Sequence, residues 1–155
     1  YVYIGKLPNA LSTTKREIVN DIFIGNNLFI VRKEGRLANG KKNSITQFEM
    51  PLDALSWAVG SIETMFERKP SQGGLAKDVL HTDKTFDGEK LELRYGVSVA
   101  GEGIGGYTLT NFSRDCYILP GEAAQTFSFA LSIWQDHARD MYQDIVRRYQ
   151  AGEFG

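Results

Sequence analysis

Two kinds of hydrophobic spacing alternate along the 155-residue chain, and each predicts a different backbone structure. Apolar residues at every second position predict β-strands, whereas apolar residues three or four positions apart predict helices. The β pattern predicts a strand in each of the ranges 1–5, 17–24, 28–34, 44–50, 75–86, 91–99, 104–112 and 115–119. The helical pattern follows each group of four strands, first from Pro51 to Phe66 and then from Pro120 to Gly152. The chain is therefore expected to be α+β, with a unit of strands followed by a helix occurring twice.

Short polar turns support one hairpin in each unit. Gly25-Asn26-Asn27 separates two predicted strands of the first unit, and Asp87-Gly88 separates two of the second. Glycine, asparagine and aspartate tolerate the positive φ angles of tight hairpin turns better than other residues do. The polar segment 35–43 predicts a longer loop before the fourth strand.

Two similar sequence steps suggest an internal duplication. Met50-Pro51-x-Asp53-Ala54 and Leu119-Pro120-x-Glu122-Ala123 each follow a predicted strand. Proline is favoured at the first position of a helix, and an acidic residue suits its first turn. We therefore expect one domain over residues 1–155, with a first repeat over about 1–70 and a second over about 71–152.

The predicted helices have more apolar surface than one sheet needs. Phe129 and Ile133 lie opposite the main apolar stripe of the second helix, at 100° per residue, and Trp57 lies off the stripe of the first. A second apolar face needs either a partner subunit or a second layer within the same chain. We expect Trp57, Phe129 and Ile133 to form a subunit interface, with the internal layer as the alternative.

The composition permits a folded core and excludes several classes of protein. Hydrophobic residues make up 42% of the chain and the net charge is only −1, which is not the composition of a disordered protein. No apolar run approaches the roughly 18 residues of a membrane span, so no membrane partner is expected. Cys116 is the only cysteine, so neither a disulfide framework nor a zinc-binding cysteine cluster is expected.

Positive charge is concentrated in the first third of the sequence. Residues 1–50 contain eight Lys or Arg residues and four acidic ones, whereas the rest contains ten and fifteen. Such an asymmetry predicts a surface for a polyanion, although ordinary solvated charge is the alternative. The predicted phosphate-binding residues are Lys6, Lys15, Arg16, Arg32, Lys33, Arg36, Lys41, Lys42 and, in the second unit, Arg94.

No recognisable set of catalytic residues stands out. Gly101-x-Gly103-x-x-Gly106 matches the bare dinucleotide-binding pattern, but that site needs a helix after the glycines, and a strand is expected here. The two histidines, His81 and His137, are far apart and form no paired zinc motif. Since no nucleophile, base and orienting group can be named, we expect no enzyme activity, no metal and no cofactor.

Two short motifs add to the order of strands and helices. Tyr3-x-Gly5-Lys6 is similar to the Tyr-Lys-Gly-Lys opening of plant Whirly proteins, with Ile4 in place of the first lysine. Asp115-Cys116-Tyr117-Ile118-Leu119-Pro120 is similar to their last strand and helix start. The chain thus resembles the Whirly and PUR-alpha group of single-stranded nucleic-acid-binding proteins. It looks most like the kinetoplastid mitochondrial RNA-binding proteins, which bind guide RNA.

The resemblance implies both a fold and a function. The fold is a pair of antiparallel four-stranded sheets packed with two helices. In the mitochondrial proteins, two related subunits form a heterotetramer that binds guide RNA and promotes its annealing to messenger RNA during RNA editing. We accordingly expect a mitochondrial subunit that binds single-stranded RNA by its phosphate backbone, independently of sequence, and leaves the bases free to pair. Any targeting segment is expected to lie upstream of Tyr1.

Two other functions remain open. One is a Whirly-like single-stranded DNA-binding protein in transcription or genome maintenance. Its stacking platforms would be Tyr1, Tyr3, Phe29 or Tyr107. The other is a structural subunit that contacts a basic partner through the acidic second half of the chain.

Overall fold

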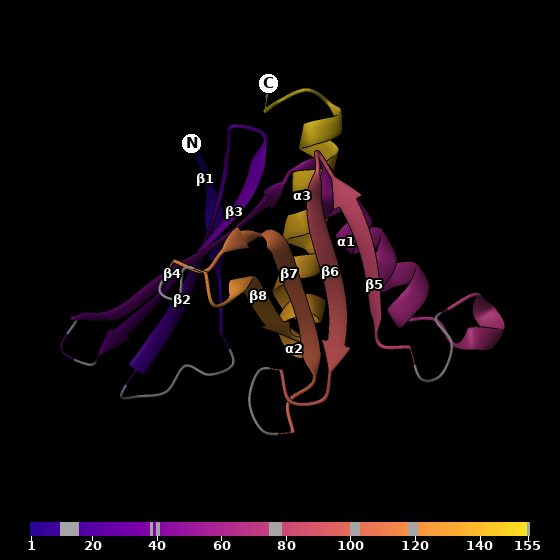
Figure 1. Ribbon diagram of the computed structural model, residues 1–155, viewed down its shortest axis with the longest axis horizontal. Helices are drawn as coiled ribbons and strands as arrows, with labels where there is room; N and C mark the ends of the chain where they lie inside the picture. Colours follow the sequence, from indigo (N-terminus) through magenta and orange to yellow (C-terminus); the bar gives the residue numbers. More distant parts are fainter. Residues whose placement is uncertain are drawn as a thin grey trace.

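The chain forms two antiparallel four-stranded sheets and two helices, as Figure 1 shows. This computed structural model describes residues 1–9, 16–37, 39, 41–74, 79–99, 103–117 and 121–154. In each half, four strands are followed by a helix, which confirms the predicted α+β class and the predicted order of elements.

The first half contains the sheet with strand order β1-β2-β3-β4, in which each strand is antiparallel to the next. Its strands are β1 (Val2–Leu7), β2 (Arg16–Gly25), β3 (Leu28–Leu37) and β4 (Lys42–Pro51). The first helix consists of α1 (Asp53–Ser61) and a π-helical turn (Ile62–Phe66), and a turn of 3₁₀ helix (Pro70–Gln72) follows it.

The second half repeats this order as β5-β6-β7-β8, again antiparallel throughout. Its strands are β5 (His81–Phe86), β6 (Glu89–Gly96), β7 (Gly106–Asp115) and β8 (Ala124–Ala130). The second helix consists of α2 (Leu131–Ile133), a π-helical turn (Trp134–Ala138) and α3 (Arg139–Gln150).

The two predicted hairpins are confirmed, and their turns have the expected backbone. Asn26 and Asn27 have φ angles of 53° and 60° and join β2 to β3. Asp87 and Gly88, with φ angles of 50° and 78°, join β5 to β6 in the same way. Two consecutive residues with positive φ give the turn whose twist matches that of the paired strands.

The predicted start of the second helix is wrong. Residues 124–130 form β8, and the helix begins at Leu131 instead of Pro120. Phe127 and Phe129 are buried on the same face of β8, with the period of two that a strand requires. The helical pattern was misleading because Phe127, Leu131 and Trp134 are also spaced by four and three.

The neighbouring strand prediction is wrong as well. β7 continues to Asp115, and the chain then turns at Cys116 and Tyr117, whereas residues 118–120 lie outside the described part. The proposed match between Pro51 and Pro120 therefore fails, because Pro51 ends β4 directly before α1 while β8 separates Pro120 from the second helix. Of the predicted strand 75–86, the described strand covers His81–Phe86.

The inner faces of both sheets and one side of each helix form a shared hydrophobic core. An aromatic group lies where the second helix meets both sheets. Tyr142 of α3 contacts Phe29 of β3 and Phe129 of β8 edge-on, at ring-centroid distances of 5.5 and 5.9 Å. Trp134 packs against Phe129 at 6.2 Å and, like Tyr142, is fully buried. The second helix thus holds the two sheets together from the inside.

Of the predicted interface residues, Phe129 is buried inside the chain. It is only 5% exposed and lies on β8, so its assignment to a second helix face is wrong. Trp57 is half-buried and packs against Phe86 of β5 at 5.6 Å. Ile133 is half-buried against the core. The internal second layer accounts for Phe129, while an interface through the exposed parts of Trp57 and Ile133 stays a prediction.

Side-chain hydrogen bonds connect the two helices along their lengths. Tyr149 near the end of α3 donates to Asp53 at the start of α1. At the opposite end, Glu67 after the first helix accepts hydrogen bonds from Trp134 and Arg139, both at 2.8 Å. Since early residues of one helix meet late residues of the other, the helices run antiparallel.

A polar joint connects the edge strand β4 to the second sheet. The backbone N–H of Glu49 donates to the side-chain oxygen of Gln125 at 2.8 Å. The side-chain amide of Asn111 donates to the backbone carbonyl of Glu49, also at 2.8 Å. Asn111 and Gln125 are both buried. Two amide side chains therefore satisfy backbone groups that an edge strand would otherwise leave without partners.

Charged groups extend this joint toward solvent. Arg114 donates to Glu89 at 2.6 Å and to Glu49 at 3.2 Å, and Tyr117 donates to Glu49 at 2.7 Å. Burial raises the pKa of the Glu89 carboxyl, but hydrogen bonds from Arg114 and Asn111 outweigh it and leave the pKa lowered. The ionised form of Glu89 thus contributes to the stability of the joint.

Replacing Phe129 tests whether it belongs to the core. We expect Phe129→Ala to lower the free energy of unfolding by about 3–5 kcal/mol, since a buried phenylalanine leaves a cavity when truncated. Urea unfolding measures the loss, and Phe112→Ala, at an exposed position of β7, is the matched control. A normally stable Phe129→Ala protein that forms smaller oligomers would instead place Phe129 at an interface.

The lowered pKa of Glu89 predicts a pH-dependent contribution to stability. The carboxylate stabilises the fold at pH values above its ordinary pKa of 4.5, and this contribution is lost as the pH falls through the lowered value. Glu89→Gln should therefore be less stable than the wild type at pH 7, with a smaller difference at pH 3. Chemical denaturation at both values measures this, and Glu122→Gln, at an exposed position outside the joint, is the control.

Candidate nucleic-acid interface

The strand register places several of the predicted cations on the outer face of the first sheet. Side chains alternate between faces along a strand, and Phe29 and Val31 of β3 belong to the core. Arg32, Glu34 and Arg36 therefore project from the opposite face. Lys6 of β1 pairs with Asp21, and Asp21 pairs with Arg32, so Lys6 and Arg32 lie in one row across three strands.

An aromatic row lies beside this charged row. Tyr3 of β1 pairs with Phe23 of β2, and their ring centroids are 5.2 Å apart. The Tyr3 hydroxyl donates to Asp21 at 3.0 Å, and burial together with this hydrogen bond raises the pKa of the phenol. Since Tyr3 is half-exposed, this face combines cations with an accessible ring.

A buried carboxylate organises the two arginines on this face. Glu34 is only 3% exposed and lies between Arg36, at 2.8 Å, and Arg32, at 3.8 Å. The hydrogen bond to Glu34 raises the pKa of Arg36. Both guanidinium groups retain exposed surface. Glu34 thus holds both arginines in position and offsets part of their charge.

The other predicted cations do not all lie on this face. Lys33 projects to the opposite side, into a groove of about 210 Å³ that is also lined by Thr46 and Cys116. Lys41 is exposed beside the turn before β4. Arg94 lies on the outer face of the second sheet and donates to Glu92 at 2.9 Å. The predicted set is therefore distributed over three surfaces.

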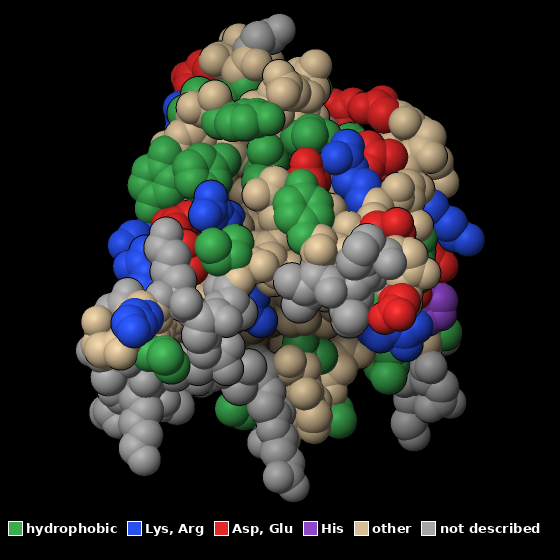
Figure 2. All heavy atoms as spheres, turned by 60° about the vertical axis from the view of Figure 1, so that its left-hand side comes forward, with side chains coloured by type: hydrophobic (Ala, Val, Ile, Leu, Met, Phe, Trp, Pro, Cys, Tyr) green, Lys and Arg blue, Asp and Glu red, His purple; other side chains and the backbone are tan. Residues whose placement is uncertain are grey.

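Three members of the predicted set cannot be placed. Lys15 lies outside the described residues, as do the side chains of Arg16 and Lys42. Figure 2, in which the side of the first sheet comes forward, shows Lys and Arg side chains separated by acidic and hydrophobic ones. The excess of positive charge in residues 1–50 therefore does not form one uniform basic field on the described part of this side.

The proposed stacking platforms differ in accessibility. Tyr1 is 82% exposed and Tyr3 is 50% exposed. Phe29 and Tyr107 are both buried in the core, and burial raises the pKa of Tyr107 to about 12. A stacking role for Phe29 and Tyr107 is therefore wrong for the folded chain, whereas Tyr1 and Tyr3 are available to a base.

The outer face of the second sheet is polar throughout its described positions. By register, Thr108, Thr110, Thr126 and Ser128 share this face, and the hydroxyl groups of Thr108 and Ser128 are 2.9 Å apart. His81, Asp83 and Glu92 lie near its β5 edge, with possible ligand atoms within 4.8 Å of one another. This is the group of side chains that could hold a metal ion among the described residues.

Sequence reasoning missed the acidic partners of the cations. The alternation Arg32-x-Glu34-x-Arg36 would place all three side chains on one strand face, and Glu92-x-Arg94 repeats this pattern in the second sheet. A search for opposite charges two residues apart in predicted strands would have found both groups. The spacing alone does not show that Glu34 is buried.

Comparisons with known proteins leave the resemblance untested. No protein-family model matches the chain, and a search of the curated proteins finds no match. Within the described residues, none of the helices has the length and apolar character needed to cross a membrane. The Whirly-like assignment and the mitochondrial location accordingly stay predictions.

Proposed function

We propose that this chain binds single-stranded RNA, mainly through the phosphate backbone, on the outer face of the first sheet. The row formed by Lys6 and Arg32 beside the accessible Tyr3 ring is the observation that carries this proposal. Neighbouring strands are about 4.8 Å apart, so Lys6 and Arg32 stand about 10 Å apart across β2. Flexible cationic side chains at this separation are suited to successive phosphates of an extended strand.

The character of the face favours nucleic acid as the ligand. Single-stranded nucleic-acid-binding proteins combine cations that follow the backbone with aromatic side chains on which bases stack. Lys6, Arg32 and Arg36 supply the first element, and Tyr1 and Tyr3 supply the second. Because the cations outnumber the accessible rings here, backbone contacts are the main contribution in our proposal, and most bases remain free to pair with a second RNA.

The more specific expectations rest on the resemblance. Guide RNA as the ligand, RNA annealing during mitochondrial editing and assembly with a related subunit are part of the proposal on that basis alone. The second candidate, single-stranded DNA binding, is favoured by the exposure of Tyr1 and Tyr3, because stacking does not require a 2′-hydroxyl.

The salt dependence of binding distinguishes phosphate contacts from stacking. For single strands, the logarithm of the binding constant falls with the logarithm of salt concentration by about 0.7 per phosphate contact. The double variant Lys6→Ala/Arg32→Ala should reduce this slope by one to two contacts' worth and weaken all RNA sequences nearly equally. Tyr3→Ala should leave the slope unchanged and cost at most about 1–3 kcal/mol.

Fluorescence anisotropy with poly-U, a mixed-sequence RNA and the matched DNA measures these effects. Lys90→Ala, at an exposed position of β6, removes one cation elsewhere and is the control. If Tyr3→Ala abolishes binding while the double variant keeps the wild-type slope, backbone binding is wrong and the stacking mode is favoured. Tighter binding to DNA than to RNA would favour the second candidate.

Glu34 provides a test in the opposite direction. Glu34→Gln removes the charge that offsets Arg32 and Arg36. If those arginines contact phosphates, this variant should bind RNA several-fold more tightly and with a steeper salt slope. Glu63→Gln removes the same charge from the first helix and controls for net charge, and circular dichroism verifies folding. Unchanged affinity of a folded Glu34→Gln protein would contradict a role for these two arginines.

A further inference from the structure

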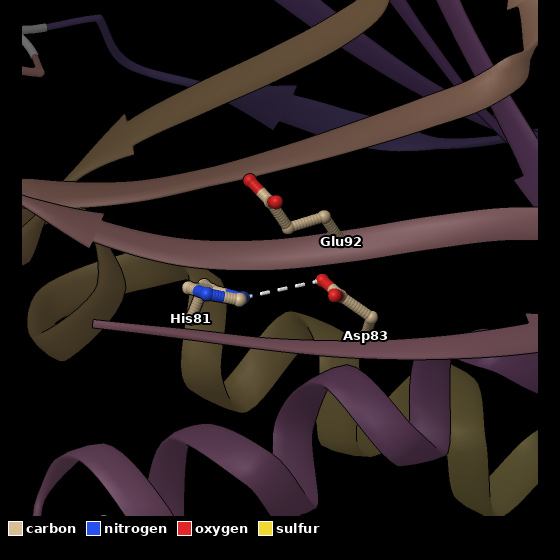
Figure 3. A group of neighbouring side chains, drawn as sticks. All are labelled: His81, Asp83 and Glu92. Carbon is tan, nitrogen blue, oxygen red and sulfur yellow. Dashed lines mark ion pairs between the residues drawn. The ribbon is translucent and has the colours of Figure 1, made fainter. Parts of the chain in front are cut away.

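Three potential metal ligands meet on the outer face of the second sheet, apart from the proposed RNA surface. Figure 3 shows His81 and Asp83 side by side on β5, with Glu92 next to them on β6. His81 and Asp83 are two residues apart and thus share a face, and Asp83 is directly opposite Glu92 in the strand register. The backbone pairing of the β5–β6 hairpin therefore brings the three side chains together.

We propose that His81, Asp83 and Glu92 bind a divalent transition-metal ion such as Zn²⁺. The Nδ1 atom of His81 and the Oδ1 atom of Asp83 are 3.4 Å apart. Two ligands about 2.1 Å from a tetrahedral metal are themselves about 3.4 Å apart, so these two atoms already have a suitable separation. All the ligand atoms lie within 4.8 Å of one another, and rotation of the Glu92 side chain would complete the set.

Electrostatics favour a cation at this position. Like charges directly opposite each other on an antiparallel pair are destabilising, and Asp83 and Glu92 are such a pair. Arg94 bonds to Glu92, and His81 faces Asp83, but a neutral histidine leaves the Asp83 charge without compensation. A divalent ion held by both carboxylates would remove this repulsion.

The ligand types select the class of metal. Imidazole nitrogen suits zinc and its transition-metal neighbours, whereas magnesium and calcium are bound mainly by oxygen. His81 and Asp83 are exposed, so solvent can reach the ion, and water completes its coordination. Three protein ligands with an open position are a common arrangement for bound zinc.

Arg94 is a competitor for the same carboxylate. Its Nε and Nη2 atoms donate to the two oxygens of Glu92 at 2.9 and 3.4 Å. A metal ion must take at least one of these oxygens. Arg94→Gln should therefore tighten metal binding several-fold, an effect that loss of general structure would not produce.

Titration of the tag-free protein with Zn²⁺ by calorimetry tests the proposal. We expect one ion per chain, with affinity at least tenfold weaker in His81→Ala and in Glu92→Gln, and no displacement by millimolar Mg²⁺. His137→Ala removes the other histidine, which is exposed on the second helix, and should leave the affinity unchanged.

Paramagnetic Co²⁺ locates the ion in the unmodified protein, independently of any variant. In nuclear magnetic resonance spectra, amide signals of β5 and β6 should broaden first. The proposal is overturned if no stoichiometric binding occurs, if binding survives His81→Ala, or if the first signals to broaden surround His137.

Discussion

The arrangement of both sheets depends on how the edge of β4 is satisfied. Unpaired backbone groups of a strand edge are costly to bury, and Asn111 and Gln125 supply hydrogen bonds to both backbone groups of Glu49. Because these bonds come from side chains, the second sheet meets β4 without extending the first sheet. The two outer faces thus remain separate surfaces, one with the Lys6–Arg32 row and one with the hydroxyl-rich centre.

Both outer faces use a similar electrostatic arrangement. An acid and an arginine two residues apart on a strand bond to each other, as Glu34 does with its flanking arginines and Glu92 does with Arg94. Such internal pairing orients each guanidinium before any ligand arrives. It also means that an incoming phosphate or metal ion exchanges one partner for another and does not neutralise a free charge. The net gain per contact is consequently smaller than a count of cations in the sequence suggests.

Local patterns predicted the parts of the fold that depend on neighbouring residues. Asn26-Asn27 and Asp87-Gly88 specify their turns by backbone preference alone, and both hairpins follow. β8 was missed because Phe127, Leu131 and Trp134 fit a helix, and the pairing of Phe127 with Leu109 that makes this segment a strand is a tertiary interaction. The surface was harder to predict for the same reason. Cationic positions are visible in the sequence, but the burial of Glu34 and the opposite directions of Arg32 and Lys33 follow from sheet pairing and packing.

The position of Cys116 has a practical consequence. Its sulfur lies 4.0 Å from the Thr46 hydroxyl, so the second half of the chain here touches the first sheet, at the groove that Lys33 also lines. The sequence has no other cysteine. A fluorophore attached by thiol chemistry would therefore occupy a single defined position between the two halves. The native chain thus offers an intrinsic labelling point for following how the two sheets move relative to each other.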